Sequence, residues 1–147
     1  MIIGVGTDMI EIERVERAIR KPGFLRKCFT GSELELLAAK GPQSYAASFA
    51  GKEAAAKALG TGFRGFSPQD VEILRDRLGK PFVQLRGKAA ELAARLGVSK
   101  MHISLAHSQQ FAMAFAVAEV APDAESAPQA ERRENDAGGH TPADAGD

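Results

Sequence analysis

The first ten residues alternate as a β-strand does. The side chains predicted to face one way are Ile3, Val5, Thr7 and Met9. Asp8 lies on the opposite face with Gly4 and Gly6, which bring bare backbone close to whatever covers that face. Such a face has room for a ligand beside the carboxylate. Alternatively, Asp8 ends the strand and caps the helix that follows, and the local pattern leaves both interpretations open.

Two later segments, residues 100–106 and 111–117, alternate in the same way, and the second contains an alanine at every other position. We predict an antiparallel hairpin with His107 at its turn, exposed or half exposed, where most histidines have no chemical role. A shorter hairpin is predicted from residues 71–73 and 82–85. Gly79 lies at its tip, and Pro81 opens its second strand, where a missing amide is tolerated.

The segment from Ser48 to Gly62 has helical periodicity and is small and apolar on nearly every side, which is typical of a buried helix. Glu53 and Lys57 lie one turn apart in the middle of an apolar stripe, and a buried carboxylate needs a partner. Lys57 is one such partner, in a pair that supports the helix. In the other interpretation, Glu53 helps to hold a divalent metal while Lys57 faces a phosphate.

Residues 11–21 are predicted to form an amphipathic helix whose apolar side faces the core. Arg14, Arg17 and Lys21 recur at helical spacing and form one basic stripe. Such a stripe is ordinarily solvated, but it also suits an acidic helix of a partner protein. Phe24 follows a Pro-Gly break and either enters the core or extends this surface.

Three further patterns indicate residues that support the fold rather than a functional site. Thr30 and Glu33 have the spacing of a capping box at the start of a short helix, which we expect to stop at Gly41-Pro42. Residues 87–96 read as another helix, and Gly97 suits its C-terminal cap.

The charge of the 147 residues is zero overall but unevenly distributed. Residues 1–121 hold 17 Lys and Arg against 12 Asp and Glu, whereas residues 122–147 hold 2 against 7. A basic body suits anionic partners. The acidic tail has no hydrophobic periodicity, so we expect one domain over residues 1–121 followed by a disordered segment.

The single cysteine, Cys28, excludes an internal disulfide, and no signal peptide or long apolar run is found. We therefore expect a soluble cytoplasmic protein. The sequence contains no cysteine-based metal motif, Walker-type loop or dinucleotide fingerprint.

Five motifs occur in a characteristic order: GVGTDMIEIERV, FTGSEL, FAGKEAAAKALGTG, LGKPFV and ISLAHSQQFAMAFAV. Together they resemble holo-acyl-carrier-protein synthase, the small bacterial type of 4′-phosphopantetheinyl transferase. The resemblance covers residues 1 to about 120. It implies transfer of the phosphopantetheine arm of coenzyme A to a serine of apo acyl carrier protein, with release of adenosine 3′,5′-bisphosphate, in support of fatty acid biosynthesis.

The resemblance also implies roles for individual residues. Asp8 and Glu53 would be the catalytic magnesium ligands, since Mg²⁺ takes one or two carboxylates together with substrate phosphate oxygens. The acceptor of the serine proton would be Glu53 or a metal-bound water, with water favoured. Lys57 and His107 would contact the coenzyme A phosphates, with His107 also near the chemistry, and Gly79 and Pro81 would border the adenine.

For the fold, the resemblance implies a compact α+β protomer in which a small antiparallel sheet packs on a long central helix. Three such protomers would form a homotrimer with coenzyme A between subunits. The helix bearing Arg14, Arg17 and Lys21, together with Phe24, would dock the acidic carrier protein. No nucleic acid or membrane partner is implied.

Some positions depart from the family pattern. Ser48 stands where many relatives place an arginine, so the phosphate contact would be absent or moved to Lys52 or Arg64. Leu78 replaces a more usual polar residue, and Gly51 places a helix-weakening residue near Glu53. Two other functions therefore stay open: a binding module without catalysis, and a magnesium-dependent hydrolase of the coenzyme A pyrophosphate.

Overall fold

The computed structural model describes residues 1–122; the predicted acidic tail lies outside the described residues, apart from its first position. Three long strands, β1 (Ile2–Glu11), β4 (Val98–His107) and β5 (Phe111–Val120), form an antiparallel sheet in the order β1-β5-β4. A second, two-stranded antiparallel sheet consists of β2 (Val71–Arg75) and β3 (Pro81–Leu85). Both predicted hairpins and the α+β class are confirmed.

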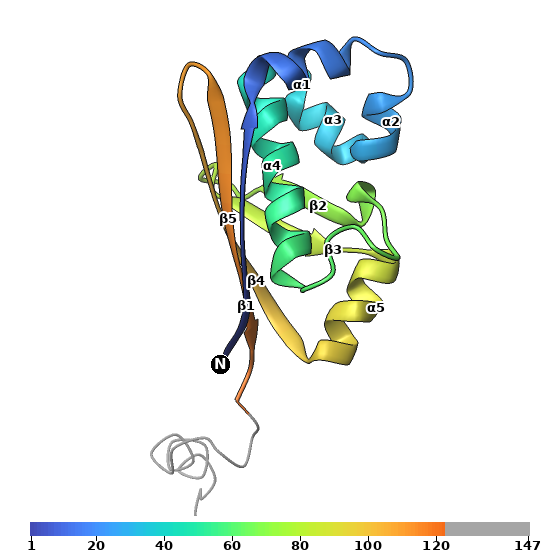
Figure 1. The fold of residues 1–147 in the computed structure, drawn as a ribbon, viewed down its shortest axis with the longest axis vertical. Coiled ribbons are helices and arrows are strands. Elements are labelled where there is room, and N and C mark those ends of the chain that lie inside the picture. The colour runs from blue at the N-terminus through green and yellow to red at the C-terminus, as the bar shows by residue number, and fades with distance from the viewer. Residues whose placement is uncertain (123–147) are drawn as a thin grey trace, which may run out of the picture.

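The helices all lie on one side of the three-stranded sheet (Figure 1). Their bounds are α1 (Ile12–Ile19), α2 (Phe24–Cys28), α3 (Gly31–Leu37), α4 (Pro42–Ala58) and α5 (Gly87–Leu96), with a 3₁₀ turn at Pro68–Asp70. The 17-residue helix α4 packs on β1, β5 and β4. The antiparallel sheet packed on a helix, as expected from the sequence, is therefore present.

Helix α4 begins six residues before the predicted start at Ser48. Pro42, which we read as a stop for the preceding helix, is the first residue of α4, where its missing amide costs nothing. The end is as predicted: Gly60, just beyond α4, has a φ of 90° in the left-handed region. The capping box of Thr30 and Glu33 and the left-handed cap at Gly97 are also confirmed.

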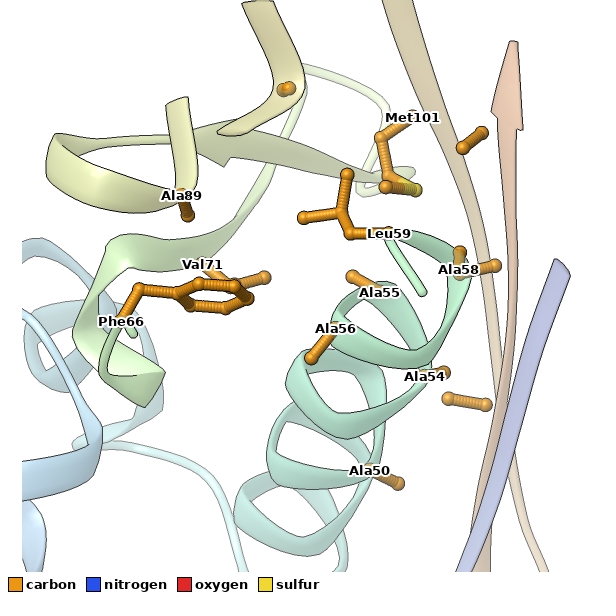
Figure 2. Packing of buried hydrophobic residues seen from close by; sticks show 14 residues of the cluster. Ala50, Ala54, Ala55, Ala56, Ala58, Leu59, Phe66, Val71, Ala89 and Met101 are labelled. Carbon is orange, nitrogen blue, oxygen red and sulfur yellow. The ribbon is translucent and has the colours of Figure 1, made fainter. Parts of the chain in front are cut away.

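The core is built largely of alanine, which lets helix and sheet approach closely. Four consecutive inward positions of β5 are buried alanines, namely Ala112, Ala114, Ala116 and Ala118. In Figure 2, Ala50, Ala54 and Ala58 of α4 point towards the strands, and Ala56 points to the opposite side, where Phe66 lies. Opposite β5, α4 therefore meets alanines, whereas the larger side chains of Ile103 and Leu105 fill the space towards β4.

The glycines of β1 bring the strand against α4. A Cβ atom at Gly4 would lie 1.9 Å from the carbonyl oxygen of Ala58, and one at Gly6 would lie 1.9 Å from that of Ala54. Both obstacles are backbone, so neither position accepts a larger residue without moving the strand. At Gly51 of α4, a Cβ atom would lie 2.4 Å from Cδ1 of Ile73, so a larger residue there would force the side chain of Ile73 to move.

The outer face of the three-stranded sheet is apolar, and no element within residues 1–122 covers it. Its exposed hydrophobic side chains are Ile3, Val5, Met9, Phe111, Met113 and Phe115, with exposed fractions between 38% and 62%. We call these six residues the outer apolar face. A contiguous exposed surface of this kind usually marks an interface.

Candidate active site

Asp8 and Glu53 come from two elements that the glycines of β1 hold together. Asp8 lies two residues after Gly6, on the face of β1 that contacts α4. Glu53 lies on α4, one residue before Ala54, whose carbonyl oxygen abuts Gly6. The close backbone contact therefore places the two carboxylates next to the same opening.

That opening is a pocket of about 430 Å³ at the junction of β1, α1 and α4. Its lining residues are Asp8, Met9, Ile10, Arg14, Val15, Ala18, Phe24, Phe49 and Glu53. Six of the nine lining residues are apolar, and the charged groups among the other three are two carboxylates and one guanidinium. A pocket of this composition suits a ligand that has both an apolar part and an anionic part bridged by a cation.

The surroundings of Glu53 disfavour its negative charge. Burial raises the pKa of Glu53, the charge of Asp8 raises it further, and Lys57 opposes both effects. Glu53 has no hydrogen-bond or ion-pair partner within residues 1–122, although its neighbour Asp8 has one. Two adjoining carboxylates, one of them unpaired, constitute a site that a cation would stabilise.

Lys57 pairs with Asp8 rather than with Glu53. Its ammonium group donates hydrogen bonds to the carbonyl oxygen of Thr7 at 3.0 Å and to Oδ1 of Asp8 at 3.3 Å. Within residues 1–122, Lys57 forms no ion pair with Glu53, so the predicted pair along the helix is replaced by one with Asp8, although the charge of Lys57 still lowers the pKa of Glu53. The lysine spans from α4 to β1 instead.

The donor set suits magnesium. Over the described part of the chain, no cluster of three or more His, Cys, Asp or Glu residues can hold a metal ion. The two carboxylates of Asp8 and Glu53 are nevertheless what Mg²⁺ needs when phosphate oxygens and water supply its remaining ligands. The residues present therefore fit a magnesium ion that binds together with a phosphorylated substrate.

Other predicted site residues lie elsewhere in the single chain. His107 ends β4, opposite Ala112, and lines a separate pocket with Gln43 and Ser108. Gly79, whose φ is 85°, lies at the hairpin tip and lines another pocket with Ser48. One protomer does not bring these residues to the pocket of Asp8 and Glu53.

Two basic side chains that the sequence analysis did not single out line the pocket at Gly79. Lys40 and Arg75 line it beside Ser48, and the guanidinium of Arg75 donates to the carbonyl oxygen of Gly79 at 3.3 Å. Pro81 opens β3 as predicted but lines a different pocket, with Lys80, Lys100 and His102 among its residues. The hairpin tip thus separates Gly79 from Pro81.

The predicted basic stripe faces solvent beside the carboxylate pocket. The helix is shorter than predicted, so Arg14 and Arg17 lie on α1 and Lys21 lies beyond its last residue, Ile19. Arg14, Arg17 and Lys21 are exposed, and Arg14 lines the pocket. Phe24, whose placement the sequence left open, lies 5.9 Å from Phe49 between ring centroids and also lines the pocket. It therefore belongs both to the core and to the rim of the site.

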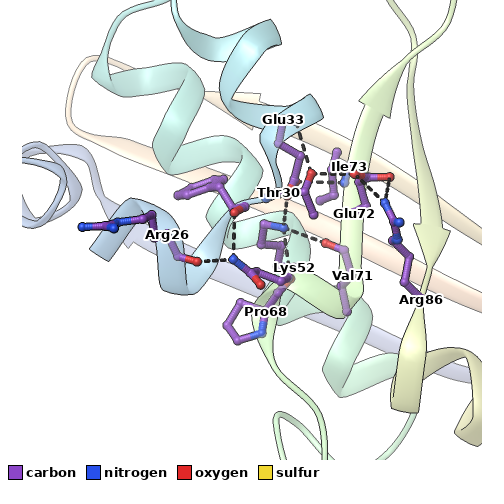
Figure 3. A network of polar contacts seen from close by, with 11 residues as sticks. Arg26, Thr30, Glu33, Lys52, Pro68, Val71, Glu72, Ile73 and Arg86 are labelled. Carbon is purple, nitrogen blue, oxygen red and sulfur yellow. Dashed lines mark hydrogen bonds and ion pairs between the residues drawn. The ribbon is translucent and has the colours of Figure 1, made fainter. Parts of the chain in front are cut away.

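Lys52, a candidate phosphate contact, is unavailable for that role. Its side chain is fully buried, and its ammonium group donates to Oε1 of Glu33 at 2.6 Å and to the carbonyl oxygens of Val71 at 2.7 Å and Pro68 at 3.0 Å (Figure 3). All three of its donors are used. Burial lowers the pKa of Lys52, and the Glu33 carboxylate opposes that effect.

Glu33 is the centre of a buried network rather than only a capping residue. Besides Lys52, its carboxylate accepts the amide of Thr30 at 3.0 Å and, through Oε2, the amide of Ile73 at 3.0 Å. The hydroxyl of Thr30 continues the network to Glu72 at 2.5 Å. The capping-box spacing identified Glu33 and Thr30, but nothing in the local pattern indicated the lysine.

Comparison with known proteins agrees with this fold. The family model described as the 4'-phosphopantetheinyl transferase superfamily matches residues 4–116, which include both carboxylates, all of β4 and most of β1 and β5. The chain therefore belongs to the 4′-phosphopantetheinyl transferase superfamily.

The relatives within that superfamily are holo-[acyl-carrier-protein] synthases. The synthase of Clostridium novyi is 48% identical over 123 residues, covering 82% of this chain and 89% of the relative. The solved holo-ACP synthase of Plasmodium yoelii is 30% identical, with a TM-score of 0.74 and coverage of 83% and 98%. The Helicobacter pylori synthase, solved in complex with coenzyme A, is 30% identical, with a TM-score of 0.71 and coverage of 78% and 99%. The resemblance identified from the motifs is confirmed.

Within the described residues, no helix combines the length and the apolar character that crossing a membrane requires. The cytoplasmic location expected from the sequence stays a prediction.

Proposed function

We propose that this enzyme transfers the 4′-phosphopantetheine group of coenzyme A to a serine of apo acyl carrier protein and releases adenosine 3′,5′-bisphosphate. The observation that carries the proposal is the convergence of Asp8 and Glu53 on one pocket beside the basic helix α1. Relatives that are holo-[acyl-carrier-protein] synthases support the reaction, and the coenzyme A complex of one of them supports the donor. The product supplies the carrier of fatty acid biosynthesis.

The two carboxylates of the pocket and the neighbouring Lys57 would each have a part in this reaction. A magnesium ion held by Asp8 and Glu53 would neutralise charge on the pyrophosphate and on the departing bisphosphate. Lys57 is placed to bind the pyrophosphate from the α4 side. The serine proton would pass to Glu53 or to a water molecule beside it, because Glu53 is one of the two carboxylates that line the pocket.

The carrier protein docks on α1. Arg14, Arg17 and Lys21 present cations to solvent next to the pocket, and Phe24 adds an apolar contact at its rim. An acidic helix seated there would direct its serine towards Asp8 and Glu53. Charge complementarity of this kind chiefly accelerates association and selects the partner.

Mass spectrometry of apo acyl carrier protein incubated with this enzyme, coenzyme A and Mg²⁺ tests the proposal. We expect the carrier to gain one phosphopantetheine group and adenosine 3′,5′-bisphosphate to appear. An unchanged carrier with intact coenzyme A would indicate a binding module instead. Free phosphopantetheine would indicate hydrolysis of the coenzyme A pyrophosphate by water.

The active assembly is a homotrimer in which neighbouring chains complete the coenzyme A site. Ser48 and Lys57 are nine residues apart on α4, so they lie on opposite sides of the helix at about 100° per residue. One ligand therefore cannot reach both the Gly79 pocket and the Asp8 pocket of one chain along a direct path. The outer apolar face supplies the contact surface, and His107 and Pro81 would contribute to the site from the neighbouring chain.

Light scattering should give the mass of three chains for the wild-type protein. Phe115→Glu buries a charge in the contact surface and is therefore expected to yield monomers that bind coenzyme A at least about tenfold more weakly. Circular dichroism checks that this variant remains folded. A wild-type protein that transfers phosphopantetheine as a monomer would contradict the trimer while leaving the reaction in place.

A further inference from the structure

Lys57 contacts one of the two carboxylates of the pocket, Asp8, and this contact bears on how a metal ion binds there. Its ammonium group contacts Oδ1 of Asp8 at 3.3 Å and the carbonyl oxygen of Thr7 at 3.0 Å. The side chain of Lys57 is 51% exposed, whereas that of Asp8 is only 19% exposed. The lysine thus covers one side of a metal-binding carboxylate from solvent.

This contact disfavours a metal ion that arrives alone. A divalent ion held by Asp8 and Glu53 would lie within a few ångströms of the Lys57 ammonium and be repelled by it. It would also compete with the lysine for Oδ1 of Asp8. The two carboxylates therefore bind a cation less tightly than they would without the lysine.

An anionic substrate removes the unfavourable effect of Lys57 on metal binding. The pyrophosphate of coenzyme A offers the ammonium group of Lys57 a second acceptor, and the exposed lysine stem has the freedom to turn towards it. Asp8 would then be available to the metal, and the negative charge of the pyrophosphate would offset the like-charge repulsion between Lys57 and the metal.

We propose that Lys57 couples the binding of Mg²⁺ to the binding of the pyrophosphate group, so that the metal binds tightly only when coenzyme A is present. This inference rests on the proposed function for the identity of the ligand. It assigns Lys57 a positioning role on Asp8 in addition to a contact with phosphate. By thermodynamic reciprocity, Mg²⁺ must raise the affinity for coenzyme A by the same factor.

The test is calorimetric titration of Mg²⁺ into the substrate-free protein, compared among the wild type, Lys57→Gln and Lys57→Arg. We expect Lys57→Gln to bind Mg²⁺ about 3- to 10-fold more tightly than wild type, because one positive charge near the metal is removed. Lys57→Arg keeps the charge and should resemble wild type. Lys88→Gln, an exposed lysine of α5, controls for the change in net charge.

The second measurement is the affinity for coenzyme A with and without Mg²⁺, in the absence of carrier protein. We expect Mg²⁺ to tighten coenzyme A binding strongly in wild type and at least about threefold less in Lys57→Gln. Equal Mg²⁺ affinity of wild type and Lys57→Gln, including no binding by either, overturns the coupling. Loss of transfer by the wild-type protein would instead overturn the proposed function, so the two failures are distinguishable.

Discussion

Exchange of Asp8 for Asn, or of Glu53 for Gln, is expected to lower kcat/KM for phosphopantetheine transfer by at least about 10³-fold, or about 4 kcal/mol in activation free energy. Each variant keeps the shape of its side chain but removes one of the two carboxylates that line the pocket. Steady-state assays with carrier protein, coenzyme A and excess Mg²⁺ measure the loss.

The same two variants should leave the fold intact, and this separates a functional role from a structural one. Glu53 is a half-buried carboxylate whose pKa is raised by burial and by Asp8, so replacing it with a neutral amide relieves an unfavourable charge. We therefore expect Glu53→Gln to be at least as stable as wild type. Such an opposition between stability and activity is typical of catalytic carboxylates.

Glu91→Gln is the matched control, because it removes an exposed carboxylate of α5 far from the pocket. Its activity and stability should equal those of wild type. Turnover within about tenfold of wild type by Asp8→Asn or Glu53→Gln, at saturating Mg²⁺, would exclude these carboxylates as the metal ligands.

The elements that follow from local pattern were predictable, and the contacts between them were not. Alternation and helical periodicity identify β1, the two hairpins and α5 because residues two, three or four apart share a face whatever lies opposite. The two glycines of β1 marked a close approach, but only the structure shows that α4 makes it. Asp8 and Glu53 were linked by resemblance to a family, not by periodicity.

The two lysines of α4 show that neighbouring residues in the sequence do not identify the partner of a charged side chain. Lys52 lies outside the apolar stripe of α4, and a lone lysine in such a position is usually solvated. In the structure, however, its partner is Glu33, which is 19 residues away and belongs to another helix. Lys57 has an acidic neighbour one turn away, yet it bonds to β1, 49 residues away. Ion pairs between residues that are distant in the sequence produce no periodic pattern, so only the structure reveals them.

The buried pair of Glu33 and Lys52 carries the second large expected effect, on stability. Glu33→Gln is expected to lower the free energy of unfolding by about 3 to 5 kcal/mol, because it leaves the ammonium group of Lys52 fully buried without a counter-charge. The amide of Gln also turns a donor towards either Lys52 or the amide of Ile73, both of which are donors. Urea unfolding at a fixed protein concentration measures the loss.

Glu16→Gln provides the control, since it is the same chemical change in an ion pair with Arg20 whose side chains are 42% and 73% exposed. We expect it to cost less than about 1 kcal/mol, because solvent screens an exposed pair. The double variant Glu33→Gln with Lys52→Met removes both charges and should cost less than the sum of its single changes. If Glu33→Gln is no more destabilising than Glu16→Gln, the network does not hold α3 and β2 against α4, and the position of Glu53 on that helix must be secured by the alanine core alone.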